Sequence, residues 1–169
     1  MICVGKRRLS IDYWIFKVKD EVGGLYGRRG FAIYDHRMRD GFWALREENE
    51  KGRLEANISL LKKGDYALFY LVGLGGSRFL GTAILDSGFE QLDAETAKNI
   101  VHREYLDWDQ GVFLKDINKW VNPLPMEALR GKESFVADGG KISPFFQGAI
   151  KKISSQEYHI ILREHELVS

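Results

Sequence analysis

The chain has 169 residues, of which 44% are hydrophobic and 29% charged, so one domain with a substantial core is expected and a disordered chain is excluded. No apolar run approaches the roughly 20 residues of a membrane-spanning helix. Lysines and arginines exceed acidic residues by a net charge of only +1, so any contact with nucleic acid must depend on a local cluster of cations. Cys3, the single cysteine, excludes an internal disulfide, and the N-terminus lacks the features of a secretory signal, which predicts a cytoplasmic protein.

The first predicted strand covers residues 11–19, where Trp14, Phe16 and Val18 share one face. Glycines and arginines then break the pattern over residues 20–41, which predicts a loop that is locally basic. The chain therefore begins with a strand and continues into a basic segment.

The pattern of residues 65–85 predicts a hairpin at the centre of the fold. Residues 66–72 are apolar throughout, as in a strand buried on both faces, and a glycine-rich turn at residues 73–77 leads into a second apolar strand. Ahead of the hairpin lie a short apolar island at residues 41–45 and a predicted amphipathic helix at residues 54–63. We expect the rest of the chain to wrap around this pair of strands.

The region after the hairpin alternates between helix and strand patterns. Asp93 is a predicted N-cap that opens about three turns of helix, and residues 111–117 return to strand character. Residues 120–131 contain Pro123 and Pro125 and are predicted to be irregular.

Short elements are predicted to close the fold. Residues 134–137 favour one more strand, and Ser143 with Pro144 opens a predicted helix that continues through Ile150. Residues 154–157, Ser-Ser-Gln-Glu, form a capping box that opens the last helix. Strands come first, with helices between and after them, so the predicted fold class is α+β.

The sequence carries no recognisable catalytic apparatus. The glycine-rich turn lies between two strands and lacks the Lys-Ser/Thr pair of a phosphate-binding loop, and the Gly-x-Ser-x-Gly, His-Glu-x-x-His and Cys-x-x-Cys motifs are absent. Four histidines and one cysteine give no metal-ligand spacing. Asp107 and Asp109 could form an acid–base pair, but a solvated loop is the simpler interpretation. We therefore expect a binding protein with no cofactor, and not an enzyme.

Aromatic residues close to basic ones are the remaining signal. Trp43 follows the arginine-bearing segment, and Phe89, Tyr105 and Trp108 follow the hairpin. One interpretation makes these residues part of the core or its rim. The other makes them the walls of a pocket that stacks on a nucleobase, with arginines on the neighbouring phosphates.

Five segments carry a family resemblance: YWIFK (13–17), GFWA (41–44), LKKGDYALFY (61–70), FLGTAIL (79–85) and SPFFQGAI (143–150). Their order and spacing resemble the PUA-like superfamily, which contains the EVE and YTH domains. The resemblance implies a strongly curved, barrel-like mixed sheet surrounded by helices. It also implies an aromatic cage that receives a modified base, N6-methyladenine in the YTH branch.

The resemblance assigns roles to particular residues. It places the first cage tryptophan at Trp43 and implies a second cage wall at Phe89, Tyr105 or Trp108, without a choice among the three. Asp20 lies nearest to the position from which YTH domains contact the edge of the base. Contacts to phosphates are expected from Arg28, Arg29, Arg37, Arg39, Lys141 and Lys151.

The chain is also similar to the recognition domain of archaeal McrB-type modification-dependent restriction enzymes, because it joins a YTH-like Trp43 to a late segment in the EVE style. This similarity implies base flipping of N6-methyladenine in DNA, within a restriction system whose AAA+ motor and nuclease subunits would be partners. A reader of methylated RNA, a small-molecule or nucleotide-binding protein, and a structural module remain the alternatives.

Overall fold

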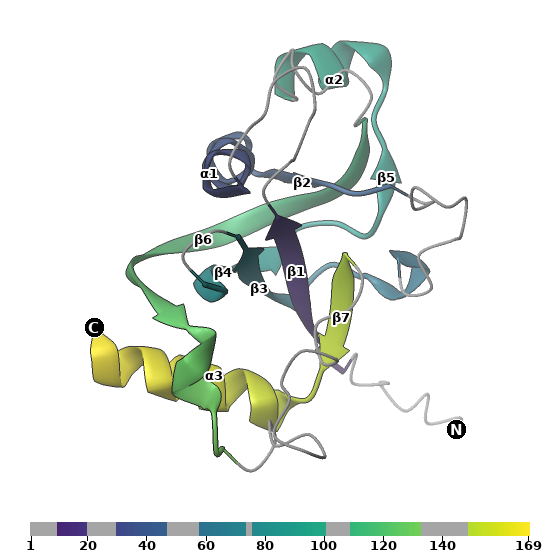
Figure 1. The fold of residues 1–169 in the computed structure, drawn as a ribbon. Helices are drawn as coiled ribbons and strands as arrows, with labels where there is room; N and C mark the ends of the chain where they lie inside the picture. The colour runs from purple at the N-terminus through teal and green to yellow at the C-terminus, as the bar shows by residue number, and fades with distance from the viewer. Residues whose placement is uncertain (1–9, 20–29, 47–57, 74–75, 101–108, 133–148) are drawn as a thin grey trace, which may run out of the picture.

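The structure, a computed structural model, describes residues 10–19, 30–46, 58–73, 76–100, 109–132 and 149–169 (Figure 1). None of its described helices is both long enough and apolar enough to span a bilayer. In chain order the elements are β1 (Tyr13–Lys19), α1 (Gly30–Asp40), β2 (Phe42–Ala44), the short 3-10 helix η1 (Ile58–Leu60), β3 (Tyr66–Val72), β4 (Arg78–Leu85), β5 (Glu90–Gln91), α2 (Ala94–Ile100), β6 (Gln110–Pro125), the 3-10 helix η3 (Met126–Leu129), β7 (Ile150–Ile153) and α3 (Ser155–Val168).

The strands form one mixed sheet in the order β2-β6-β4-β3-β1-β7, and β5 also pairs with β6. The pairing of β1 with β3 is parallel, and the other pairings are antiparallel. The sheet curls, because Trp43 on β2 contacts Phe16 on β1 although three strands separate β2 from β1 in the order. Figure 1 shows β6 crossing the molecule as a long, bent strand, with α1 and α3 on different sides of it. The predicted curved, barrel-like α+β fold is confirmed.

The predicted central hairpin is β3 and β4. Ala67, Phe69 and Leu71 of β3 lie in one buried cluster, and Leu68 and Tyr70 lie in another. This division confirms a strand buried on both faces and gives the domain two cores. The first core is covered by α1 and the second by α3.

The first predicted strand is confirmed as β1, with Trp14, Phe16 and Val18 together in the first core. A buried carboxylate fixes the start of this strand. Asp65, which is fully buried, accepts hydrogen bonds from the indole nitrogen of Trp14 at 3.0 Å and from Nζ of Lys62 at 2.9 Å. Hydrogen bonds and an ion pair to the Asp65 carboxylate therefore hold the beginnings of β1 and β3 together.

The prediction of a loop over residues 20–41 is wrong for its second half, where residues 30–40 form α1. Ile33, Tyr34 and Met38 recur there at helical spacing, so they share one face of the helix. All three lie in the first core, against the sheet. The helix ends at Gly41, whose φ of +64° suits the left-handed conformation that terminates many helices. Residues 20–29 lie outside the described residues.

The prediction that residues 120–131 are irregular is also wrong, since β6 runs to Pro125 and η3 follows it. The strand accommodates its prolines through irregular pairing with β4. Gly81 is opposite Lys119 and Phe79 is opposite Leu124, so β6 uses extra residues in the interval that holds Pro123. Such bulges bend a strand and leave residues without ladder hydrogen bonds, which is where proline is tolerated.

Other predicted elements have mixed outcomes. The N-cap at Asp93 is confirmed, because its Oδ1 accepts the backbone N–H of Thr96 at 2.7 Å, and the capping box of α3 is present at Ser154 and Glu157. The predicted helix through Ile150 is wrong at that residue, which begins β7 and pairs with β1. Within the described part of residues 54–63, the helix is only η1. Residues 134–137 and 143–148 lie outside the described residues.

Candidate base-binding site

Trp43 is the central residue of β2, the short strand that follows α1. Successive side chains of a strand point to opposite faces. Accordingly, Phe42 and Ala44 pack with Leu92 in a small separate cluster, whereas Trp43 turns into the first core and is only 1% exposed. The predicted cage tryptophan therefore lies inside the curled sheet.

The indole of Trp43 is surrounded by flat side chains. The ring of Phe69 on β3 lies 4.8 Å away between centroids, at an angle of 30°, and the ring of Phe16 on β1 lies 5.9 Å away, edge-on at 68°. The guanidinium carbon of Arg37 on α1 lies 4.5 Å from the indole centroid. Side chains from β1, β3 and α1 thus converge on one ring.

Arg37 reaches the indole because it shares the inward face of α1 with Ile33 and Tyr34. Arg37 is 9% exposed, whereas Arg39 in the same turn is exposed. A cation over an aromatic face gains about 0.5 to 2 kcal/mol, more when it is desolvated. The two arginines of this helix turn therefore differ, because one is held against Trp43 and the other faces solvent.

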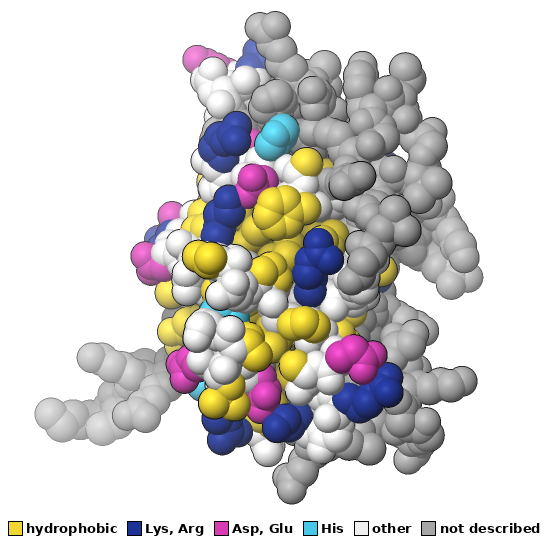
Figure 2. Space-filling view, turned by 60° about the vertical axis from the view of Figure 1, so that its left-hand side comes forward, with side chains coloured by type: hydrophobic (Ala, Val, Ile, Leu, Met, Phe, Trp, Pro, Cys, Tyr) yellow, Lys and Arg dark blue, Asp and Glu magenta, His cyan; other side chains and the backbone are white. Residues whose placement is uncertain are grey.

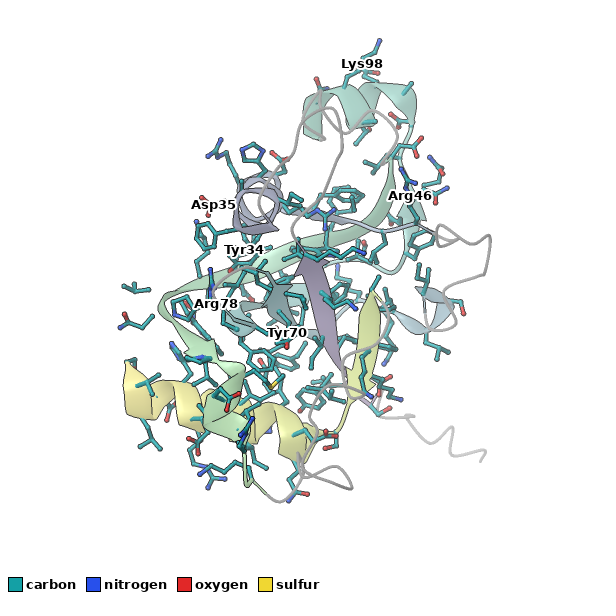
Figure 3. All side chains as sticks on the ribbon, viewed as in Figure 1. Tyr34, Asp35, Arg46, Tyr70, Arg78 and Lys98 are labelled. Atoms are coloured by element: carbon teal, nitrogen blue, oxygen red, sulfur yellow. The ribbon has the colours of Figure 1, made fainter. Side chains whose placement is uncertain are left out.

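Two polar contacts attach α1 to the sheet. The hydroxyl of Tyr34 donates to the carbonyl oxygen of Leu80 at 3.2 Å, and burial raises the pKa of Tyr34 well above its usual value. Asp35 forms an ion pair with Lys119 of β6. Figure 3 labels Tyr34 and Asp35 beside α1, on the side toward the bend of β6. This helix is therefore a fixed wall above the Trp43 ring.

Gly111 on β6 allows β2 to approach closely. A Cβ atom at this position would lie 2.0 Å from the carbonyl oxygen of Trp43 and 2.9 Å from the ring of Phe42. Since no side chain fits there, the backbone of Trp43 lies directly against β6.

The other predicted site residues fall into two groups. Phe89, between β4 and β5, is half-buried and packs against the core cluster that contains Trp43, whereas Lys151 lies on β7 opposite Ile15 of β1. Phe89 is thus the candidate for the second cage wall that the structure describes. The residues that lie outside the described ranges are Asp20, Arg28, Arg29, Tyr105, Trp108 and Lys141.

Sequence reasoning missed the aromatic partners of Trp43. Phe16 and Phe69 are central residues of two predicted strands, and nothing in their local pattern indicates that β2 folds over them. The inward position of Arg37 does have a signal, because Arg37 follows Ile33 by four residues and Tyr34 by three. That spacing becomes informative only once residues 30–40 are recognised as a helix.

Charges of both signs are mixed on one face of the described part of the molecule. Figure 2 shows Lys and Arg side chains scattered among acidic ones on the face that it presents, with hydrophobic side chains along its middle. Among the described residues, no group of three or more His, Cys, Asp or Glu side chains could hold a metal ion. A groove of about 740 Å³ on α3 is lined by Lys132, Gln156, His159, Ile160, Arg163 and Glu164.

No protein-family model matches the chain, and no curated protein sequence matches it. Solved structures do. The human THYN1 protein in complex with DNA containing 5-methylcytosine is similar over 92% of this chain and 98% of its own, with a TM-score of 0.59 and 16% identity. The DUF55 domain of human thymocyte nuclear protein 1 is similar over 92% of this chain and 99% of its own, with a TM-score of 0.59 and 18% identity.

A third similar structure is the YTH domain of the Zygosaccharomyces rouxii MRB1 protein in complex with N6-methyladenosine RNA. The similarity covers 92% of this chain and 87% of that one, with a TM-score of 0.55 and 13% identity. The chain therefore shares the fold of these structures, a YTH domain among them, as the family resemblance implied.

Proposed function

We propose that the protein binds nucleic acid that carries a modified base, and that the base is received against Trp43. The observation that carries the proposal is the shared fold, which covers 92% of the chain in two structures solved as complexes with methylated DNA or methylated RNA. The aromatic side chains and the arginine that contact Trp43 support the choice of site, whereas its 1% exposure is the feature that favours the alternative of a structural module.

In the proposed pocket, stacking of the base on aromatic rings would offset the cost of extruding it from a duplex. Extruding a base from a duplex costs a few kcal/mol. Stacking on an aromatic ring is worth about 1 to 3 kcal/mol per base, so Trp43 together with Phe89, Tyr105 or Trp108 would offset that cost. Since Trp43 is only 1% exposed, side chains around it must move before a base enters.

Within this function we propose N6-methyladenine in DNA as the target, and the specificity domain of a modification-dependent restriction system as the role. The support is the sequence resemblance carried by Trp43 and its flanking residues. Burying one methyl group yields only about 0.8 kcal/mol. Strong selectivity therefore requires a cage whose shape leaves an unmodified amine poorly solvated.

Recognition of methylated RNA is the second candidate, favoured by the similar YTH domain that was solved with N6-methyladenosine RNA. A single strand presents its base without a flipping cost. Paired titrations of methylated single-stranded RNA and methylated duplex DNA, at one salt concentration, distinguish the two candidates.

Trp43→Leu is the variant that tests the site, because Trp43→Ala would remove most of a buried side chain and cost about 3 to 5 kcal/mol of stability. We expect Trp43→Leu to weaken binding to oligonucleotides with a modified base by roughly 1 to 3 kcal/mol. The matched control is Trp120→Leu, since Trp120 is also buried but lies in the second core. Binding by folded Trp43→Leu that equals wild type would reject the pocket and favour a structural role for the indole.

A further inference from the structure

We propose that Arg37 holds the place of the base in the free protein. Its guanidinium occupies a stacking position on Trp43, and it leaves that position when a base enters. This inference rests on the proposed function and adds how the same pocket is kept closed.

The contact places the guanidinium of Arg37 over the face of the Trp43 indole. The guanidinium carbon lies 4.5 Å from the centroid of the indole, and Phe69 lies against the same ring at 30°. A guanidinium is planar and delocalised, carries hydrogen-bond donors on its edge and stacks on aromatic faces. Among protein side chains it is therefore a close physical substitute for a nucleobase on Trp43.

The burial of Arg37 makes the contact unusual. Its side chain lies on a helix face that it shares with Ile33, Tyr34 and Met38, and it is 9% exposed. Arginine is rarely buried to this extent, because removing its charge from water is costly. Arg37 also lies in the last turn of α1, directly before Met38 and two residues before exposed Arg39. Its long side chain therefore has a short path to solvent, where its charge would meet a phosphate.

The proposal predicts competition between Arg37 and the base. A base that stacks on Trp43 must first break the guanidinium contact. Removing the guanidinium should then raise affinity by about 2- to 30-fold, which is the equivalent of about 0.5 to 2 kcal/mol of cation–π interaction. Removing an arginine that only contacts phosphate would instead lower the affinity.

The experiment compares Arg37→Met with the matched variant Arg39→Met. Both remove one positive charge from the same turn of α1, but only Arg37 contacts the indole. The probe is a methylated oligonucleotide titrated at one salt concentration. We expect Arg37→Met to bind about 2- to 30-fold more tightly than wild type, and Arg39→Met to bind no more tightly than wild type. Affinity of Arg37→Met equal to or below that of wild type overturns the proposal, and Arg37→Gln is compared by the same criterion if Arg37→Met does not fold.

Trp43→Leu separates the failure of this inference from the failure of the pocket. In the Trp43→Leu background we expect the gain from Arg37→Met to disappear, because no indole remains for the guanidinium to cover. A gain that persists there overturns the placeholder. If Trp43→Leu binds as wild type does, or if wild type binds no methylated oligonucleotide, the pocket and the placeholder are both rejected. If Trp43→Leu binds weakly and Arg37→Met brings no gain, only the placeholder is rejected.

Discussion

His165 and Trp120 form a stacked pair between α3 and β6. Their ring centroids lie 3.8 Å apart with the planes at 8°, and Trp120 is 8% exposed. The Nε2 atom of His165 is buried without a hydrogen-bond partner among the described residues. Burial lowers the pKa of His165, and the backbone of Asn122 and the carboxylate of Glu166 oppose that shift only in part. The folded protein therefore favours neutral His165.

This shift predicts a pH dependence of stability. The unfolded chain binds a proton at His165 near pH 6.5, whereas the folded chain binds it only at lower pH, so the free energy of unfolding should fall as pH drops below about 6.5. The loss amounts to at most about 1.4 kcal/mol per pH unit and ends below the folded pKa. Urea unfolding at a series of pH values measures it. We expect His165→Gln to lack this loss and His159→Gln, at an exposed position on the same helix, to retain it. A His165→Gln variant with the wild-type pH profile would contradict the assignment.

Only part of the candidate site could be predicted from the sequence. Trp43 is identified by its neighbours in sequence and by the family resemblance. Its burial could not be predicted, because it depends on β2 folding over Phe16 and Phe69, which come from distant parts of the chain. Arg37 was expected to contact phosphates, and nothing in the local sequence distinguishes it from Arg39. The two differ only in the face of α1 on which they lie, because Arg37 is on the buried face and Arg39 is exposed.

At the scale of elements, the sequence predicts best where the signal is local. β3 is evident from seven consecutive apolar or aromatic residues, and the start of α3 from the capping box at Ser154 and Glu157. β6 is harder to predict, because its prolines are tolerated only through pairing irregularities with β4. α1 is obscured by the glycines that precede it in the sequence and by its own charged residues, and its helical pattern becomes meaningful only against the sheet. The local sequence therefore predicts β3 and the start of α3, whereas α1 and the full length of β6 depend on contacts with the rest of the sheet.

The capping box gives a prediction for α3, the helix that covers the second core. The Ser154 hydroxyl accepts the backbone N–H of Glu157 at 3.0 Å, and the Glu157 carboxylate accepts the backbone N–H of Ser154 at 3.0 Å. Ser154→Ala should cost about 1 kcal/mol of stability. Urea unfolding measures this, with Ser154→Thr as a control that keeps a hydroxyl and most of the cap. Equal losses in both variants would show that the box adds little.

At the scale of the whole molecule, charge is nearly balanced. A net charge of +1, and cations scattered among acidic groups on the face in Figure 2, provide no long-range field that attracts a polyanion. Under the proposed function, affinity for nucleic acid must then come from a few cations close to the pocket. α1 places exposed Arg39 on the side of the sheet that holds Trp43, whereas α3 covers the other core.

This arrangement predicts which charges set the salt dependence of binding. For duplex DNA, the slope of log affinity against log salt concentration changes by about 0.9 for each phosphate contact. Arg39→Ala should reduce the slope by about that amount. The matched control is Lys132→Ala, which also removes one positive charge. Lys132 follows η3 and forms an ion pair with Glu164 of α3 at 2.9 Å, so this variant should leave the slope unchanged. Fluorescence anisotropy from low to moderate salt measures both slopes. Equal effects of the two variants would mean that DNA contacts the protein through its overall charge, and would contradict a specific phosphate contact at Arg39.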